Sequence, residues 1–255
     1  MKTRRITAIF LTAMILALPS LATRARGADT VDVTFDGFGA SGWTTFWAAG
    51  YAGDEIATGV YQFDKSAGSG FGNTWPNGTI SALCMEIEEP APISGTNTYQ
   101  VIMPDNAYNG TLGGILGTTK GNYLRELWGR YHDDGWNTGP FTVADNAQAE
   151  AFAAAIWEII YEDLPVSPLG WDVRTDGTLG ARGFRAQDLD ADLANAWLHS
   201  LTGAGPKADL RAFVNQGHQD YLVAVPEPAT VLLLGAGGLL SLFGRRRIKT
   251  QNSHT

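Results

Sequence analysis

Cys84 is the only cysteine of this 255-residue chain and its most obvious candidate for covalent chemistry. A thiol becomes a nucleophile when a nearby base or cation favours the thiolate. Folding could bring one of three histidines to it: His132, His199 or His218. The simpler interpretation is a small buried hydrophobe on a strand, and a lone cysteine cannot form an intramolecular disulfide.

Other catalytic patterns are missing from the sequence. It contains no His-Glu-x-x-His zinc helix, no Gly-x-Ser-x-Gly nucleophile elbow and no phosphate-binding glycine loop. Glu86 and Glu158 are carboxylates near possible sites, but sequence alone gives neither their separation nor their pKa. We therefore predict no catalytic residue, no metal and no cofactor, and a non-enzymatic protein.

One acidic stretch resembles the start of a calcium loop. Asp188, Asp190 and Asp192 alternate as early EF-hand ligands do, but Leu193 replaces the glycine at position six. His199 stands where a bidentate glutamate is needed, so helix capping is the better interpretation.

Two further features leave binding open. The loop from His132 to Asn137 could hold a cation or be a solvated turn. Exposed tryptophans could stack on sugar rings, although most of the eight should lie in the core; the candidates are Trp43, Trp75, Trp136 and Trp171.

The elements that would position these residues fall into two halves. Hydrophobic patterning predicts strands first, at residues 31–35, 56–63, 79–87 and 99–103. It then predicts helices at 123–131, 145–161 and 188–198, with short strands at 171–174, 183–185 and 219–225. Asp145 is the expected cap of the second helix, with Gln148 reaching back. This order indicates an α+β fold: an antiparallel sheet or sandwich with a helical layer or insertion.

Residues 81–161 resemble the thioester domains of bacterial surface adhesins. The resemblance is carried by the run Cys84-Met85-Glu86-Ile87 and by Ala155-Ile156-Trp157-Glu158-Ile159. It implies a thioester-domain-like fold, in which a strand cysteine and a helix glutamine join to capture an amine covalently. Here the glutamine position of the Thr-Gln-x-Ala-Ile-Trp motif is Ala153, which has no carboxamide. We therefore expect the scaffold without the covalent bond.

The C-terminal thirty residues have a different composition. Pro226, Glu227 and Pro228 precede an apolar run of fifteen residues, 229–243, which would span only ~23 Å as a helix. That is shorter than a ~30 Å hydrocarbon core. The expected membrane segment includes Ala229, Leu233, Gly238 and Phe243, and the basic tail that follows is Arg245, Arg246 and Arg247.

This order of features resembles the PEP-CTERM sorting signal. The resemblance implies export, transient insertion in the inner membrane, cleavage by an exosortase-type protease, and release to the cell surface or extracellular matrix. A plain tail anchor is the alternative.

The N-terminus is typical of a signal peptide. Lys2, Arg4 and Arg5 precede an apolar stretch, and small residues follow it, so signal peptidase could cut after Ala22 or Gly27. An uncleaved N-terminal anchor is the alternative. The expected organisation is therefore a signal peptide (1–27), one exported α+β domain of one or two lobes (28–224), and a sorting signal (225–255).

The expected exported part is strongly acidic. Residues 28–225 hold twenty-five acidic and nine basic residues, a formal charge of −16. Such a surface argues against nucleic-acid binding, which needs basic groups to neutralise phosphates.

The expected function is a structural or adhesive role outside the cell. The partners would be extracellular polysaccharide or envelope components, bound by non-covalent contacts. A covalent adhesin that uses Cys84, or a secreted hydrolase built from carboxylates, are the alternatives.

Overall fold

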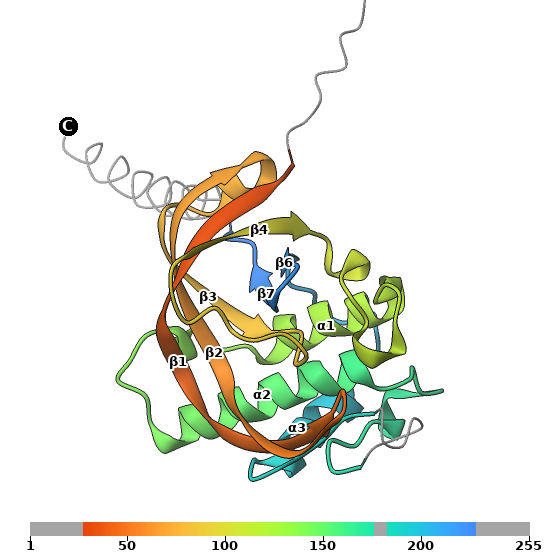
Figure 1. Ribbon diagram of the computed structural model, residues 1–255. Coiled ribbons are helices and arrows are strands. Elements are labelled where there is room, and N and C mark those ends of the chain that lie inside the picture. The colour runs from red at the N-terminus through yellow and green to blue at the C-terminus, as the bar shows by residue number, and fades with distance from the viewer. Residues whose placement is uncertain (1–27, 176–182, 228–255) are drawn as a thin grey trace, which may run out of the picture.

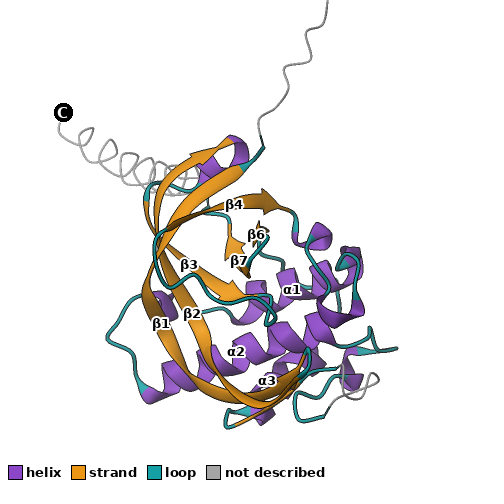
Figure 2. Cartoon of the chain, in the orientation of Figure 1, coloured by secondary structure: helices purple, strands orange, loops and turns teal. Residues whose placement is uncertain are grey.

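The computed structural model describes residues 28–175 and 183–227. Within them it contains one seven-stranded antiparallel sheet and three α-helices. The sheet curves around the helices, which lie together on its concave side (Figures 1 and 2). This is the α+β class that the sequence predicted.

A long hairpin of β1 (Thr30–Ala48) and β2 (Tyr51–Ser69) dominates the fold. Ala48 pairs with Tyr51, so Ala49 and Gly50 alone make the turn; both have positive φ, 53° and 90°, as a type I′ turn requires. Register shifts at four points mark bulges, which bend strands. The bent hairpin wraps around one side of the helices (Figure 1).

Together with this hairpin, four of the remaining strands form a closed, hydrogen-bonded sheet. The remaining strands are β3 (Gly78–Cys84), β4 (Thr96–Ile102), β5 (Arg185–Gln187), β6 (Leu210–Asn215) and β7 (His218–Ala224). The strand order is β2-β3-β7-β6-β4-β1-β5, and β1 also pairs with β2. Six strands therefore form a hydrogen-bonded ring, with only β5 added outside it on the far part of β1.

The central helix is α2 (Val143–Tyr161), which contacts β1, β2 and the other two helices, α1 (Gly117–Tyr131) and α3 (Ala191–Ser200). Every residue of α2 from Ala151 onward is buried. A helix that is apolar on all sides must be enclosed, as the sequence indicated. The core of the domain therefore lies between the hairpin and this helix.

The start of α2 differs from the expectation. Thr142, not Asp145, is the N-cap: its hydroxyl accepts from the backbone N–H of Asp145, and the Asp145 carboxylate accepts from that of Thr142. The two residues form a capping box in which Asp replaces the usual Glu or Gln. Gln148 has no part in it.

The start of helix α1 also differs from the prediction. Helix α1 begins six residues before the predicted Tyr123, because the buried Lys120 ammonium bonds to Asn109 Oδ1 and the Ile160 carbonyl, each at 2.9 Å. Tertiary contacts thus hold a glycine- and threonine-rich first turn that propensity disfavours.

The sequence-based assignment missed one strand and added another. Strand β6 was not predicted, although it lies between β4 and β7. Residues 171–174 were expected to form a strand but are a loop, fastened by side chains such as Asn195, which accepts from the Val173 N–H. β5 begins at Arg185, where the predicted strand ends.

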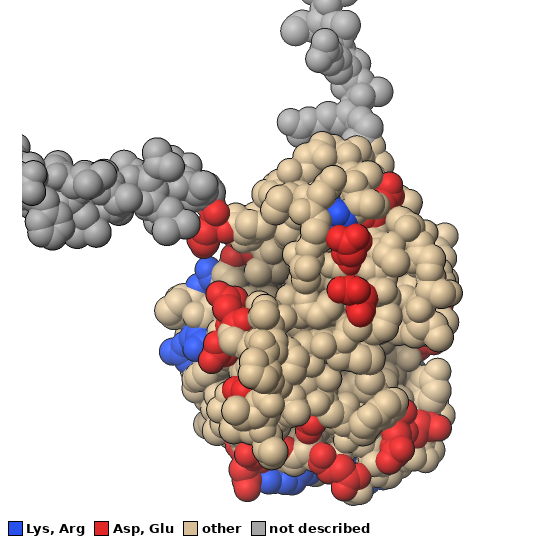
Figure 3. All heavy atoms as spheres, turned by 90° about the vertical axis from the view of Figure 1, so that its left-hand side faces the viewer, with Lys and Arg blue, Asp and Glu red and all other residues tan. Residues whose placement is uncertain are grey.

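Acidic side chains outnumber basic ones on the face shown in Figure 3. The acidic side chains, in red, are scattered over that face. This matches the excess of acidic residues in the sequence.

Candidate functional site

Cys84 is the last residue of β3 and is sealed in the core. It pairs with Tyr221 of β7, it is 1% exposed, and its thiol donates to the Glu86 carbonyl at 2.9 Å. Burial raises the pKa of the Cys84 thiol, and the nearby indole N–H of Trp157 opposes that shift only in part. That indole makes no well-formed hydrogen bond to any described residue. The thiol is therefore protonated and shielded from solvent.

The helix that the thioester resemblance singled out lies against this cysteine. Trp157 approaches the Cys84 sulfur, and Ala153 lies one turn earlier on the same face of α2, fully buried. A methyl group at Ala153 offers no carbonyl carbon for the sulfur to join. The structure therefore brings the cysteine strand and the helix together, but the helix lacks the glutamine carboxamide that a thioester needs.

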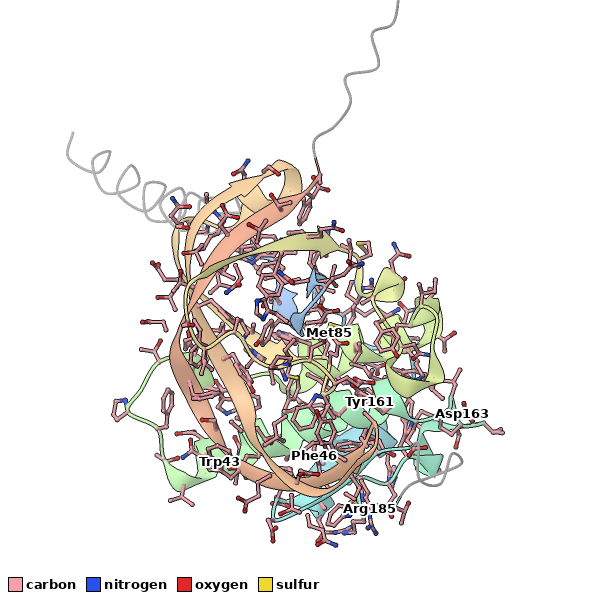
Figure 4. All side chains as sticks on the ribbon, viewed as in Figure 1. Trp43, Phe46, Met85, Tyr161, Asp163 and Arg185 are labelled. Atoms are coloured by element: carbon pink, nitrogen blue, oxygen red, sulfur yellow. The ribbon has the colours of Figure 1, made fainter. Side chains whose placement is uncertain are left out.

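The segment after β3 is held over the end of α2. The Ile87 N–H donates to the Tyr161 hydroxyl at 2.8 Å, and that hydroxyl donates to Glu88 Oε2. Met85 and Tyr161 lie in the middle of the molecule, where this segment crosses the helix (Figure 4). These contacts set the direction of the next residues, which line a cleft.

This acidic cleft has a volume of about 620 Å³ and lies between the segment after β3, strand β4 and the β6–β7 turn. Most of the residues that line it have polar side chains: Glu86, Glu89, Thr98, Gln100, Tyr108, Asn215, Gln216 and Asp220. The size falls in the range of small-molecule sites. Because Glu86 also accepts the Cys84 hydrogen bond, the acidic cleft adjoins the buried thiol.

Two carboxyl groups of the acidic cleft have shifted pKa values. Burial, then the charges of Asp220, Glu88 and Glu89, raise the pKa of Glu86 to about 8. Burial raises the pKa of Asp220 to about 6, although the Asn215 N–H donates to it at 2.9 Å. At neutral pH Glu86 therefore keeps its proton while Asp220 is mostly ionised, which places a donor and an acceptor in one cleft.

None of the predicted histidine partners bonds to Cys84 in the described ranges. His132 stacks on Trp128, His199 Nε2 contacts the Trp171 carbonyl at 2.7 Å, and His218 begins β7. The thiol instead donates to the backbone carbonyl of Glu86. A thiol–imidazole pair is therefore not assembled.

The acidic residues that resembled a calcium loop have structural partners. Asp188 accepts from the Thr45 hydroxyl, Asp190 caps α3 by accepting from the Leu193 N–H, and Asp192 pairs with Arg174. Across residues 28–175 and 183–227, no three His, Cys, Asp or Glu side chains are grouped to hold a metal ion.

Only one of the four candidate sugar-stacking tryptophans is exposed. Trp43, on the outer side of β1, is 67% exposed, whereas Trp75, Trp136 and Trp171 are buried. Phe46, three residues further along, turns its ring inward, so this part of β1 presents opposite faces to solvent and core (Figure 4).

The described chain ends inside the predicted sorting signal. The Trp75 indole donates to the Ala224 carbonyl at 2.9 Å, and the Val225 N–H donates to the Asp209 carbonyl at 2.8 Å. Pro226 and Glu227 then follow, both exposed. Pro228, the predicted membrane segment from Ala229 to Phe243, the basic tail and the predicted signal peptide lie outside the described residues. None of the helices that the structure describes is long and apolar enough to cross a membrane.

Comparison with known proteins identifies the C-terminal segment. Residues 224–247 match the PEP-CTERM protein-sorting motif. No curated protein and no solved structure matches the chain. The chain therefore carries a PEP-CTERM sorting signal, which marks an exported protein processed by an exosortase-type system.

Sequence reasoning found the sorting signal and Cys84 but not the acidic cleft. Glu86 was noted as a carboxylate near a possible site, whereas Asp220 carried no local signal. The two lie over a hundred residues apart in the sequence, and the pairing of β3 with β7 brings them together. Only the strand order could have predicted the cleft.

Proposed function

We propose that this exported protein has a non-enzymatic, structural or adhesive role at the cell surface or in the extracellular matrix. It binds polysaccharide or envelope components by non-covalent contacts. The acidic cleft is the observation that carries the proposal, because its polar side chains offer many donors and acceptors in a space of about 620 Å³.

The surroundings of Cys84 favour non-covalent binding. A covalent adhesin needs an acyl group on the thiol and an opening through which an amine can reach it. Cys84 is 1% exposed, and Ala153 occupies the position where the resemblance places the glutamine. Both requirements are therefore missing at this site.

The proposed organisation follows the limits of the sheet. Strand β1 begins at Thr30 and β7 ends at Ala224, close to the boundaries of one exported domain at 28–224. The signal peptide (1–27) would direct export. The segment 225–255 would hold the precursor in the inner membrane until an exosortase-type protease releases the domain.

A binding assay tests the role of the acidic cleft. We expect the full chain, purified in mild detergent, to bind polysaccharide extracted from its host's matrix. The double variant Tyr108→Ala, Gln216→Ala, which alters two cleft side chains, should bind about tenfold more weakly, a loss of ~1.4 kcal/mol.

The control carries the same two changes away from the cleft: Tyr51→Ala with Gln187→Ala. Equal affinity of the wild type and the cleft variant, or a cleft variant no weaker than this control, would contradict the proposal.

A secreted hydrolase is a second candidate, favoured by the pKa values in the acidic cleft. Glu86 is protonated at neutral pH and Asp220 is mostly ionised, as a general acid and a general base must be.

If the cleft is catalytic, the extracted polysaccharide should gain reducing ends. The rate should fall as pH rises past about 8, where the acid loses its proton. Glu86→Gln should abolish the reaction, and absence of new reducing ends with wild-type protein excludes this candidate.

A further inference from the structure

The acidic cleft holds carboxyl groups that no positive charge balances. Glu86, Glu89 and Asp220 line it, and the described residues of its lining include no lysine, arginine or histidine. Within residues 28–175 and 183–227, no lysine or arginine forms an ion pair with any of these three carboxyls. Like charges at short range repel one another, and a bound cation relieves that repulsion. The cleft therefore favours a positively charged ligand.

Asp220 gives the cleft a carboxylate oxygen without a partner. The side chain is 7% exposed, and its Oδ1 accepts from the Asn215 backbone N–H at 2.9 Å. Oδ2 accepts from no described residue and is not enclosed by protein atoms, so it is open to the cleft that Asp220 lines. A buried carboxylate is costly unless it is hydrogen-bonded or paired with a charge. Oδ2 is therefore available to a donor on a ligand.

Glu86 lies beside Asp220 and adds to the same negative charge. The Met85 N–H donates to the Asp220 carbonyl at 2.8 Å, which holds the segment after β3 against β7. Burial is the largest cause that raises the pKa of Glu86 to about 8, and the negative charges of its neighbours, Asp220 first, come next. An ammonium group between the two carboxyls would stabilise the ionised form of both.

An aromatic ring and uncharged polar groups complete the cleft. Tyr108 is 43% exposed. Burial, then the charges of Glu88 and Glu86, raise the pKa of Tyr108, so its side chain lies near those carboxyls. The face of an aromatic ring attracts a cation. Thr98 and Gln216 also line the cleft, both are exposed, and their neutral donors and acceptors suit the hydroxyls of a sugar.

This lining suits an organic cation better than a metal ion. No three His, Cys, Asp or Glu side chains of the described chain are grouped to hold a metal. A calcium ion takes about six to eight oxygen ligands, whereas an ammonium group has three N–H donors to satisfy. The volume of about 620 Å³ also leaves room for the molecule that carries the ammonium.

We propose that the acidic cleft binds an amino sugar through a protonated amine on its ring. This inference rests on the proposed function, because it names the kind of polysaccharide bound: one whose rings carry free amino groups. The ammonium donates to Asp220 Oδ2 and to a Glu86 carboxyl oxygen beside the Tyr108 ring, and ring hydroxyls bond to Thr98 and Gln216. A basic peptide fits less well, because uncharged groups make up the rest of the polar lining.

Two matched oligosaccharides test the proposal. A glucosamine tetramer carries free amines, whereas an N-acetylglucosamine tetramer is neutral. Each is titrated into the full chain in mild detergent, near neutral pH, by isothermal titration calorimetry. We expect the glucosamine tetramer to bind at least about tenfold more tightly, and added salt to weaken it. A tetralysine peptide, the third probe, should bind more weakly than the glucosamine tetramer.

Two variants remove negative charge with little change of shape. Asp220→Asn keeps an Oδ1 for the Asn215 N–H and should weaken binding of the glucosamine tetramer about tenfold. Glu86→Gln should weaken it about threefold, because Glu86 must lose a proton before it pairs with the amine. Glu55→Gln, on the exposed part of β2, is the matched control and should bind like the wild type. Thermal unfolding shows whether each variant is folded, and either cleft variant suffices if the other is not.

Three results would overturn the inference. They are a glucosamine tetramer that binds no more tightly than its N-acetyl counterpart, a tetralysine peptide that binds more tightly, and a folded cleft variant with unchanged affinity. The proposed function would survive any of them if the Tyr108→Ala, Gln216→Ala protein still lost affinity for the extracted polysaccharide. Equal binding of that polysaccharide by wild type and double variant would instead contradict both.

Discussion

The surroundings of Cys84 make its thiol unreactive in the folded domain. The sulfur is enclosed by β7 and α2, burial raises its pKa, and the nearest helix face offers only Ala153 and Trp157. Reaction with an external reagent requires both the thiolate and access. The folded domain provides neither.

The first prediction concerns this thiol. The intact mass of the purified protein should equal the mass of its processed sequence, with no loss of ammonia. A maleimide should label Cys84 only after unfolding. A mass deficit of one ammonia together with methylamine uptake would instead establish a thioester.

The second prediction concerns Glu86, whose pKa rises from 4.5 in the unfolded chain to about 8 in the fold. Between these values the unfolded state loses a proton that the folded state keeps, so the free energy of unfolding decreases as pH rises. Thermal melts should therefore show Tm falling from about pH 5 to about pH 8. Partial exposure of Glu86 makes the slope smaller than the pKa shift alone implies.

Glu86→Gln should flatten this dependence and raise Tm near pH 8, because it removes a carboxyl that its acidic neighbours repel. Glu55→Gln, on the exposed part of β2, is the matched control and should keep the wild-type slope. A slope that survives Glu86→Gln unchanged would show that other groups cause it.

Helix α2 is the element on which both the core and the site depend. It fills the space inside the β1–β2 hairpin, and its capping box fixes where it starts. Thr142→Ala removes one hydrogen bond to an otherwise unpaired N–H and should lower stability by ~1 kcal/mol. Denaturant unfolding measures the change, with Thr138→Ala, an exposed threonine in the preceding loop, as the control. Equal stability of the two variants would argue against the cap.

A further prediction separates the buried and exposed ends of α2. Phe152 is fully buried and contacts Trp128, Trp136 and Trp197, so Phe152→Ala should cost about 3–5 kcal/mol. Val143 is 88% exposed, and Val143→Ala should stay within about 0.5 kcal/mol of wild type. Similar losses of denaturation midpoint in the two variants would contradict this packing.

Elements with a strong local signal could be predicted, and those held by distant contacts could not. The apolar run 148–161 had to be a buried helix, and the alternation in 31–35 had to be a strand. Strand β6 has a short mixed sequence whose pairing is supplied by β4 and β7. The first turn of α1 depends on Lys120 reaching Asn109 and Ile160.

At the scale of the whole molecule, the sorting signal was predictable because it is contiguous. A proline motif, an apolar run and an arginine cluster follow one another in the sequence, and the PEP-CTERM motif covers them at 224–247. The acidic cleft was not predictable, because it gathers residues from segments that only the closed strand order unites. The α+β class could be predicted from the order of the expected strands and helices alone.

Fractionation of host cells that express a doubly tagged chain tests the central claim most directly. One tag is inserted between Ser94 and Gly95, in an exposed loop, and the other follows Lys249. An exported domain released from its sorting signal should place the loop tag at the cell surface or in the medium, on a shortened chain, and leave the tail tag with the inner membrane. Both tags on one uncut chain in the cytosol would contradict it.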